Sequence, residues 1–260
     1  MPKELNEISG LALTGDGRLL THGDQRGQVF EIDYRRGVAV KQFALGKPTV
    51  RDDFEAIAVV GDTAILLTST GKLYRFQEGA NDERVEYTID DTNLGSECQF
   101  EGMAFDPAIH ALLLACKVVH MKALRDSLVI FRWPLEGGKN ARVSRLTVPI
   151  KRVIGSNGWD GLHPSDITID PLTGNYVLVA SRERALFEIT PAGDVIFARP
   201  IPGEHDQPEG VAITKDGILI ISDEKSQGAS VKHKNRPARD DAAVVTLYRW
   251  PVAHVPRVSP

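Results

Sequence analysis

The sequence predicts an all-β protein built as a five-bladed β-propeller. A five-residue motif occurs five times, most copies begin about 45 residues apart, and short apolar segments separated by turn residues follow each copy. Four antiparallel strands repeated roughly every 40–50 residues are typical of propeller blades. A β-sandwich does not explain a motif that returns at nearly constant spacing, whereas a six-bladed propeller remains an alternative blade count.

The motif begins with an apolar residue or proline, followed by serine or glutamate, a mostly small residue, an apolar residue, and alanine or threonine. Its copies read ISGLA, FEAIA, FEGMA, PSDIT and PEGVA. Their second positions are Ser9, Glu55, Glu101, Ser165 and Glu209. These positions are separated by 46, 46, 64 and 44 residues, so one repeat carries a long insertion.

Each motif opens the first strand of a blade, and a turn rich in Gly, Asp or Pro then leads to a second strand. The second strands include AILLT, ALLLAC, YVLVAS and ILIIS, and the third strands are QVFEID, KLYRFQ, LVIFRW, ALFEIT and TLYRW. Such runs of β-branched and aromatic residues between turns indicate strands. Four repeats add a fourth strand, at VAVKQFAL, VEYTID, RLTVPI and DVIFARPI. The fifth repeat lacks one, so either the C-terminal tail or residues 1–6 are expected to close the ring.

Composition excludes several other protein classes. We expect residues 1–260 to form one domain, because 42% hydrophobic residues at this length build a sizeable core. A net charge of -4 does not favour nucleic-acid binding, and no apolar run is long enough to span a membrane. The start of the chain does not resemble a secretory signal, so a cytoplasmic monomer is expected. Cys98 and Cys116 are predicted to lie close together, and reduced thiols are favoured over a disulfide in that compartment.

Three long insertions belong to the same face of the predicted propeller, namely 117–127, 150–164 and 224–243. Long loops gathered at one end of a rigid scaffold often carry a binding site. The third insertion contains a basic stretch beginning at Ser226, with Lys232, Lys234, Arg236 and Arg239. This stretch reads either as a solvated loop or as a basic lid over an anionic ligand.

The repeated Ser/Glu position predicts a ring of polar side chains at the mouth of the central channel. A second polar tier is expected two residues earlier in each repeat, at Glu7, Asp53, Gln99, His163 and Gln207. Three glutamates crowded together repel one another, and a divalent ion relieves that repulsion. We predict Ca²⁺ held by Ser9, Glu55, Glu101, Ser165 and Glu209, with Mg²⁺ as second choice. Alternatively, the glutamates accept hydrogen bonds from amides at the start of each blade and bind no metal.

Residues at the ends of the second strands are expected to surround this ring. Asp24 and Glu224 are the candidate bases for activating water. The candidate ligand-binding residues are His22, Arg26, Lys117, Arg125, Arg182, Arg184 and Asp223. Cations beside a metal suit a phosphate-bearing ligand, because guanidinium groups match phosphate oxygens. Each of these residues could instead be a salt-bridged surface side chain.

Several segments resemble a known group of bacterial propellers. ISGLAL, DFEAIAV, FEGMAFDP, SDITIDPLTGNYVLVASRERALFEI and PEGVAI look like the SdiA-regulated and esterase-like phytase group, and the resemblance runs from about Ile8 to Glu224. The cyclic order Ser, Glu, Glu, Ser, Glu is similar to the calcium ring of five-bladed calcium-activated nucleotidases (apyrases). These likenesses imply a propeller with a calcium ring. They support the blade count and the metal more than they support nucleotidase activity.

Binding and catalysis remain competing functions. The first hypothesis is a calcium-binding propeller whose loop-rich face binds a small anionic molecule or a protein partner. The second is a calcium-dependent phosphohydrolase, and the third is a glycoside hydrolase that uses paired axial carboxylates. The sequence contains no evident nucleophile–base pair, so binding is placed ahead of hydrolysis.

Overall fold

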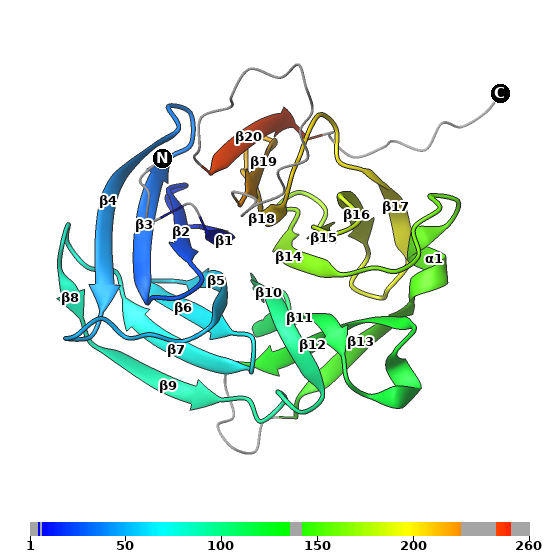
Figure 1. Cartoon of the computed structure of the whole chain (residues 1–260), viewed down its shortest axis with the longest axis horizontal. Coiled ribbons are helices and arrows are strands. Elements are labelled where there is room, and N and C mark those ends of the chain that lie inside the picture. The colour runs from blue at the N-terminus through cyan, green and yellow to red at the C-terminus, as the bar shows by residue number, and fades with distance from the viewer. Residues whose placement is uncertain (1–4, 6, 136–141, 225–242, 251–260) are drawn as a thin grey trace, which may run out of the picture.

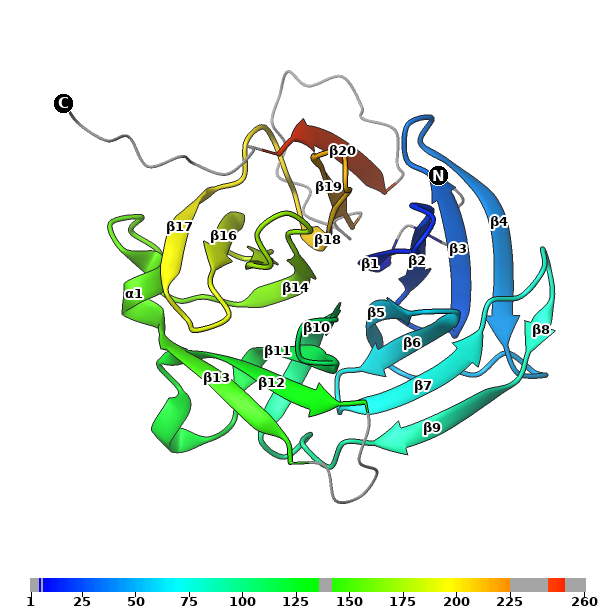
Figure 2. The same cartoon turned by 180° about the vertical axis from the view of Figure 1, so that it is seen from behind.

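Five antiparallel sheets surround a central axis in the computed structural model, which describes residues 5, 7–135, 142–224 and 243–250 (Figure 1). The same ring is seen from behind in Figure 2. Each sheet begins with one copy of the repeated motif as its innermost strand. The predicted five-bladed β-propeller is therefore confirmed, and the insertion before Ser165 adds no sixth blade.

The strands of each blade follow one another from the axis outward. Blade 1 contains β1 (Ile8–Leu13), β2 (Leu19–Gly23), β3 (Gln28–Asp33) and β4 (Val38–Leu45), with β8 (Arg84–Val85) parallel to its outer edge. Blade 2 contains β5 (Phe54–Val60), β6 (Thr63–Thr68), β7 (Lys72–Gln77) and β9 (Tyr87–Asp91). Blade 3 contains β10 (Cys98–Asp106), β11 (Ala111–Val119), β12 (Ser127–Pro134) and β13 (Ser144–Pro149).

The last two blades continue the same order. Blade 4 contains β14 (Pro164–Ile169), β15 (Tyr176–Ala180), β16 (Ala185–Ile189) and β17 (Val195–Pro200). Blade 5 contains β18 (Pro208–Ile213), β19 (Ile218–Asp223) and β20 (Val244–Arg249). Two short helices lie in the insertions of blades 3 and 4, the 3₁₀ helix η2 (Lys122–Leu124) and α1 (Ile150–Ile154).

Five buried clusters fill the spaces between neighbouring blades. The strands pack apolar residues on both faces, so each sheet contributes to two clusters, one with each neighbour. The cluster between blades 5 and 1 joins Leu5, Ile8 and Phe30 to Ala212 and Ile220, and this packing closes the ring. Blade 5 has three strands within the described residues, and both segments predicted to supply a fourth lie outside them, apart from Leu5.

Small residues let the innermost strands meet at the axis. The third motif position is Gly10, Ala56, Gly102, Asp166 and Gly210. A Cβ atom on Gly102 would lie 2.9 Å from the Cα of Asp166, and one on Gly10 would lie 3.0 Å from the Cα of Ala56. Larger side chains at those glycines would push the blades apart. The Asp166 side chain occupies the space that the small residues leave between the strands.

Asp166 binds to four innermost strands. Its carboxylate accepts hydrogen bonds from the amides of Val211 (2.8 Å), Leu11 (3.3 Å) and Ile167 (2.8 Å). The amide of Met103 also donates to it. The side chain is fully buried, and burial raises the pKa of its carboxyl well above the ordinary value despite the four amides. One side chain thus links blades 1, 3, 4 and 5.

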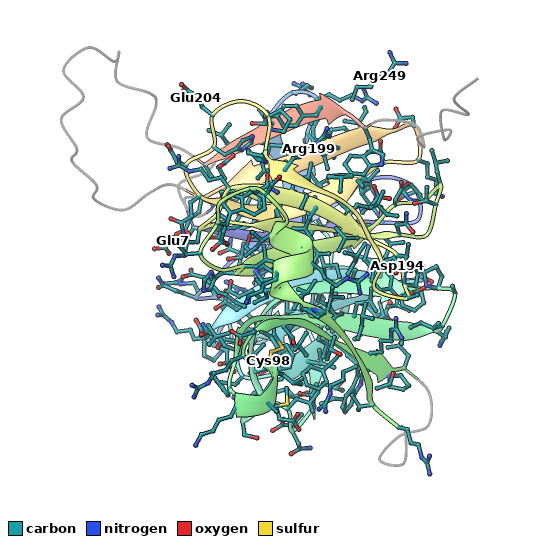
Figure 3. The ribbon with its side chains drawn as sticks, turned by 90° about the vertical axis from the view of Figure 1, so that its right-hand side faces the viewer. Glu7, Cys98, Asp194, Arg199, Glu204 and Arg249 are labelled. Atoms are coloured by element: carbon teal, nitrogen blue, oxygen red, sulfur yellow. A yellow bond between two sulfur atoms is a disulfide. The ribbon has the colours of Figure 1, made fainter. Side chains whose placement is uncertain are left out.

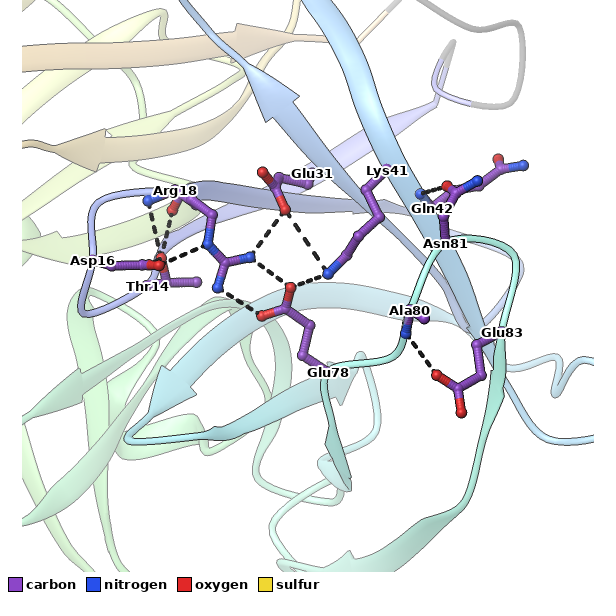
Figure 4. Close-up of polar contacts among 10 residues, drawn as sticks. All are labelled: Thr14, Asp16, Arg18, Glu31, Lys41, Gln42, Glu78, Ala80, Asn81 and Glu83. Carbon is purple, nitrogen blue, oxygen red and sulfur yellow. Dashed lines mark hydrogen bonds and ion pairs between the residues drawn. The ribbon is translucent and has the colours of Figure 1, made fainter.

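An ion-pair network joins blades 1 and 2 away from the axis (Figure 4). The Arg18 guanidinium lies 2.9 Å from a carboxylate oxygen of Glu31 in β3 and 2.9 Å from one of Glu78, which follows β7. Lys41 of β4 also pairs with Glu78. These side chains are partly exposed, so the network contributes modestly to stability.

Cys98 and Cys116 form a disulfide, with an S–S distance of 2.08 Å (Figure 3). The expectation of two reduced thiols is therefore wrong. The cysteines lie on the adjacent strands β10 and β11, with Cα atoms 5.6 Å apart, and both face the buried cluster between blades 2 and 3. Disulfides are rare in cytoplasmic proteins, so the pair does not favour the predicted cytoplasmic location. Within the described part of the chain, no helix is long and apolar enough to cross a membrane.

Candidate functional site

A β-bulge occurs at the repeated Ser/Glu position in every blade. The pairing of the first strand with the second shifts register between Ile8 and Leu11 in blade 1, and at Glu55, Glu101, Ser165 and Glu209 in the other blades. Bulges leave one residue out of the pairing and redirect its side chain. The same local irregularity therefore recurs around the axis, at the residues that the sequence singles out.

A cavity of about 280 Å³, here called the axial cavity, lies at this end of the channel. It is lined by Ser9, Asp24, Asp53, Glu55, Gln99, Glu101, Lys117, Gln207, Glu209 and Glu224. The structure thus brings together four of the five predicted ring residues, three of the second tier, both candidate bases and one candidate ligand-binding residue. Among the lining residues that the structure describes, six are carboxylic acids and Lys117 is the only Lys or Arg.

Ser165 does not line the axial cavity. Its hydroxyl is buried and donates a 2.7 Å hydrogen bond to the carbonyl oxygen of Pro208, at the start of the neighbouring strand β18. Glu7 and His163 also lie apart from the cavity lining. Glu7 lines a neighbouring cavity of about 350 Å³ with Asp24 and Arg26, and the His163 ring lies 2.7 Å from a carboxylate oxygen of Glu183.

The ring glutamates resist ionisation. Burial and the nearby Glu101 carboxylate raise the pKa of Glu55 to about 9 and that of Glu209 to about 7. Burial also raises the pKa of Glu101, although the ammonium of Lys117 opposes the shift. The cavity therefore holds more acidic groups than its own cation neutralises.

The candidate bases Asp24 and Glu224 behave in the same way. Burial and the carboxylate of Glu7 raise the pKa of Asp24 to about 6. Burial and the Asp24 carboxylate raise the pKa of Glu224 to about 7, and Gln207 donates a hydrogen bond to Glu224. Both carboxyl groups therefore titrate close to neutral pH, where an acid or base catalyst works best.

Lys117 is the resident cation of the axial cavity. Its ammonium lies 2.6 Å from a carboxylate oxygen of Glu101. Both residues are left unpaired by bulges, because Phe100 pairs with Cys116 while Gln99 pairs with Val118 and Gly102 with Ala115. Burial works against the charged ammonium, but the carboxylates of Glu101, Glu209 and Glu55 outweigh it and raise the pKa of Lys117.

The carboxylates do not converge on a single point. Among the described residues, no group of three or more His, Cys, Asp or Glu side chains is placed to hold a metal ion. The oxygen donors suit calcium in kind and number, since calcium takes six to eight oxygen ligands. Binding it would require the glutamates to move inward and Lys117 to release Glu101.

Two predicted ligand-binding residues, His22 and Asp223, are buried away from the cavity lining. His22 is fully buried, and burial lowers its pKa to about 4, so the ring is neutral at physiological pH. Asp223 lies 2.7 Å from Nδ1 of His205, whose Nε2 lies 2.7 Å from the Tyr248 hydroxyl. The sequence reasoning did not identify this Asp223–His205–Tyr248 chain, and no repeat signals it.

The predicted arginines are dispersed. Arg26 lines the cavity beside Glu7, and Arg125 lines a groove between blades 3 and 4. Arg182 and Arg184 are exposed and line neither the axial cavity nor that groove. The basic residues 232–239 lie outside the described residues. The structure therefore does not gather these arginines into one cluster around the ring.

Asp166 is the central residue that the sequence reasoning missed. The available signal was its place in the repeat, because it is the one charged residue at a position otherwise occupied by glycine or alanine. An acid at a repeat position that otherwise carries glycine or alanine indicates that the side chain from this one blade fills the space between the innermost strands.

Comparison with solved structures supports the fold. The chain is 13% identical to a PQQ-bound aldose sugar dehydrogenase from Streptomyces coelicolor, with 93% of this chain and 94% of that chain covered and a TM-score of 0.55. It is 11% identical to a luciferin-regenerating enzyme (87% and 87% covered, TM-score 0.54). It is 12% identical to Myxococcus xanthus glutaminyl cyclase (83% and 84% covered, TM-score 0.54). At these identities the likeness establishes the fold alone.

Four other matched structures are longer than this chain, which spans 52–70% of their length. No curated protein matches the sequence. Residues 149–245, from the end of blade 3 through most of blade 5, match the family model described as SdiA-regulated. This match and the ring of five sheets identify the chain as a five-bladed β-propeller with the sequence pattern of the SdiA-regulated family in residues 149–245.

Proposed function

We propose that this protein binds calcium in the axial cavity, and that the same face of the propeller binds a small anionic, phosphate-bearing molecule or a protein partner. One observation carries the proposal. Bulges in blades 1, 2, 3 and 5 direct Ser9, Glu55, Glu101 and Glu209 to one cavity, where the glutamates have raised pKa values. Buried acids without enough positive charge favour either protonation or a bound cation.

Calcium matches the donors better than other common metal ions. The described lining residues offer carboxylate, hydroxyl and amide oxygens, and none of them is cysteine or histidine. Hard cations prefer such oxygen ligands, and calcium tolerates irregular geometry that magnesium does not. A bound calcium ion would supply a positive centre that attracts phosphate oxygens, while Lys117 would remain available at the rim.

Thermal unfolding with calcium and with a chelator tests the proposal. Calcium should raise the melting temperature of the intact protein, and Glu55→Gln or Glu209→Gln should remove that rise. Glu97→Gln is a matched control, because Glu97 is a partly exposed acid that precedes β10 and does not line the cavity. An unchanged melting temperature of the intact protein in millimolar calcium would contradict the proposal.

Calcium-dependent phosphohydrolysis is the second candidate function. It is supported by Asp24 and Glu224, which share the cavity and have pKa values of about 6 and 7. The dispersed arginines do not support it, because Lys117 is the one cation among the described lining residues that could stabilise charge on phosphate. A phosphatase and nucleotidase screen with and without chelator separates the two functions. Turnover that requires calcium and is abolished by Glu101→Ala would favour hydrolysis over binding alone.

A further inference from the structure

A hollow of about 990 Å³, here called the interblade groove, lies between blades 3 and 4. Its walls come from the end of β11, the segment after it, α1 and the segment that leads into β14. The last residue of that segment, His163, lines the groove but does not line the axial cavity. The groove therefore contains a histidine that the proposed calcium site does not use.

A buried carboxylate holds the imidazole of His163. Nδ1 lies 2.7 Å from one carboxylate oxygen of Glu183, and the backbone amide of His163 donates a 3.0 Å hydrogen bond to the other oxygen. The Glu183 side chain is only 6% exposed. Because a carboxylate only accepts hydrogen bonds, Nδ1 carries the ring proton, and the lone pair of the neutral ring lies on Nε2. Glu183 is therefore a positioning residue, which fixes Nε2 as the acceptor.

The second ring nitrogen, Nε2, is available to a ligand. No described residue forms a hydrogen bond with it, and the His163 side chain is 29% exposed. The nearby Gly161 leaves the ring edge uncovered, because a Cβ atom there would lie only 3.0 Å from Cε1 of His163. An oriented imidazole with one nitrogen held and the other open is suited to accept a proton or a hydrogen bond from a bound molecule.

The walls of the groove supply apolar surface. Trp159 and Ile154 line the groove and are only partly buried, and Leu162 lies in the buried cluster between blades 3 and 4. Trp159 packs on that cluster. An indole in a concave surface suits a flat aromatic ring, since aromatic pairs gain free energy beyond the area that they bury.

The charges along the groove are balanced. The ammonium of Lys117 is paired with Glu101 at 2.6 Å. The other charged lining residues are two cations and two acids, namely Arg125, Lys151, Asp126 and Asp160. An ion that left water for this groove would lose hydration without meeting an excess of opposite charge. The lining therefore favours an uncharged molecule.

We infer that the interblade groove binds an uncharged aromatic alcohol, such as a phenol or a naphthol. The aromatic body of this ligand lies against Trp159, and its hydroxyl donates a hydrogen bond to Nε2 of His163. The site is separate from the axial cavity and needs no calcium, so the inference goes beyond the proposed function.

The probes are 2-naphthol and its methyl ether, 2-methoxynaphthalene, which keeps the aromatic rings but has no O–H to donate. Equilibrium dialysis with chelator present measures both, so the result does not depend on the calcium proposal. We expect saturable binding of 2-naphthol to the intact protein, about tenfold tighter than binding of the ether, because one hydrogen bond distinguishes them. Trp159→Ala should weaken the binding of both probes.

The variant His163→Phe keeps a ring but removes its nitrogens. It should bind 2-naphthol about tenfold more weakly than the intact protein and no longer prefer it to the ether. The matched control is His120→Phe, at an exposed histidine that follows β11 and does not line the groove, and it should leave both affinities unchanged. Near-UV circular dichroism checks that each variant keeps its tertiary packing.

Glu183→Ala tests the positioning role through the ring tautomer. Nitrogen-15 shifts of labelled histidine should place the proton of the neutral His163 ring on Nδ1 in the intact protein and on Nε2 in Glu183→Ala, which should also lose the preference for 2-naphthol. An unchanged tautomer would overturn the role of Glu183. The binding inference is overturned if the intact protein binds neither probe or binds both equally, or if His163→Phe and His120→Phe behave alike. The comparison of the two probes needs only the intact protein, so it stands even where a variant fails to fold.

Discussion

At the scale of single residues, the axial cavity combines excess acid with one competing cation. The ring glutamates have raised pKa values because water is excluded and because they face one another. The ammonium of Lys117 neutralises part of the negative charge through its contact with Glu101. Protonation, Lys117 and the proposed calcium ion would therefore compete for the same carboxylates, and each competition can be measured.

The pH dependence of stability follows from Glu55. Its pKa is about 9 in the folded protein against an ordinary value of 4.5, so the folded state holds a proton that the unfolded chain releases. This contribution to stability is complete below pH 4.5 and is lost as the pH rises through 9. Without calcium, we expect the free energy of unfolding to fall between pH 5 and pH 9. Urea titrations should show a shallower fall in Glu55→Gln, and an identical slope in both proteins would contradict this assignment.

Lys117→Met tests the competition between the ammonium and calcium. Removing the ammonium leaves Glu101 without its 2.6 Å partner, so the carboxylates should bind calcium more tightly. We expect a gain of about tenfold in calcium affinity, or about 1.4 kcal/mol, by calorimetric titration. Lys122→Met removes an exposed lysine outside the cavity and should leave the affinity unchanged. Equal affinities in both variants and the intact protein would mean that Lys117 does not compete.

At the scale of strands, the bulges decide which way the ring residues face. Regular alternation along β10 and β11 would pair Glu101 and Lys117 with partners across the ladder. The observed register leaves both unpaired and brings them together. The turn residues and apolar alternation of each strand were predicted from the sequence, whereas the bulges were not. A bulge depends on how closely a strand approaches its neighbours at the axis, which a local pattern does not record.

The disulfide belongs to the same strand pair. It closes a segment with a sequence separation of 18 residues, and a crosslink of that size stabilises the folded state by about 3 kcal/mol. The variant Cys98→Ala/Cys116→Ala should therefore unfold at lower urea concentration than the oxidised protein. Thiol titration of the isolated protein in denaturant, without reductant, should detect no free thiol. Detection of two thiols would show that the pair is reduced in the isolated protein.

At the scale of the whole molecule, Asp166 connects blades that are distant in sequence. Its carboxylate accepts hydrogen bonds from backbone amides of β1, β10, β14 and β18. Two of these strands, β1 and β18, belong to the blades 1 and 5 that meet where the ring closes. Asp166→Asn keeps the size of the side chain but turns a donor toward some of these amides. We expect a loss of about 2 kcal/mol in the free energy of unfolding, because buried amides lose their acceptors. Asp194→Asn, at an exposed site, should change it by less than about 0.5 kcal/mol.

The number of blades and the strand that carries each polar ring residue were determined by the sequence itself. Each blade is a local unit, so its turns, alternating apolar residues and repeated motif are visible within about 45 contiguous residues. Only the tertiary structure decided that Ser165 turns to Pro208, that Cys98 bonds to Cys116, that Asp166 fills the axis and that a groove separates blades 3 and 4. These features depend on contacts between different strands and blades, where a shift of one residue reverses the direction of a side chain.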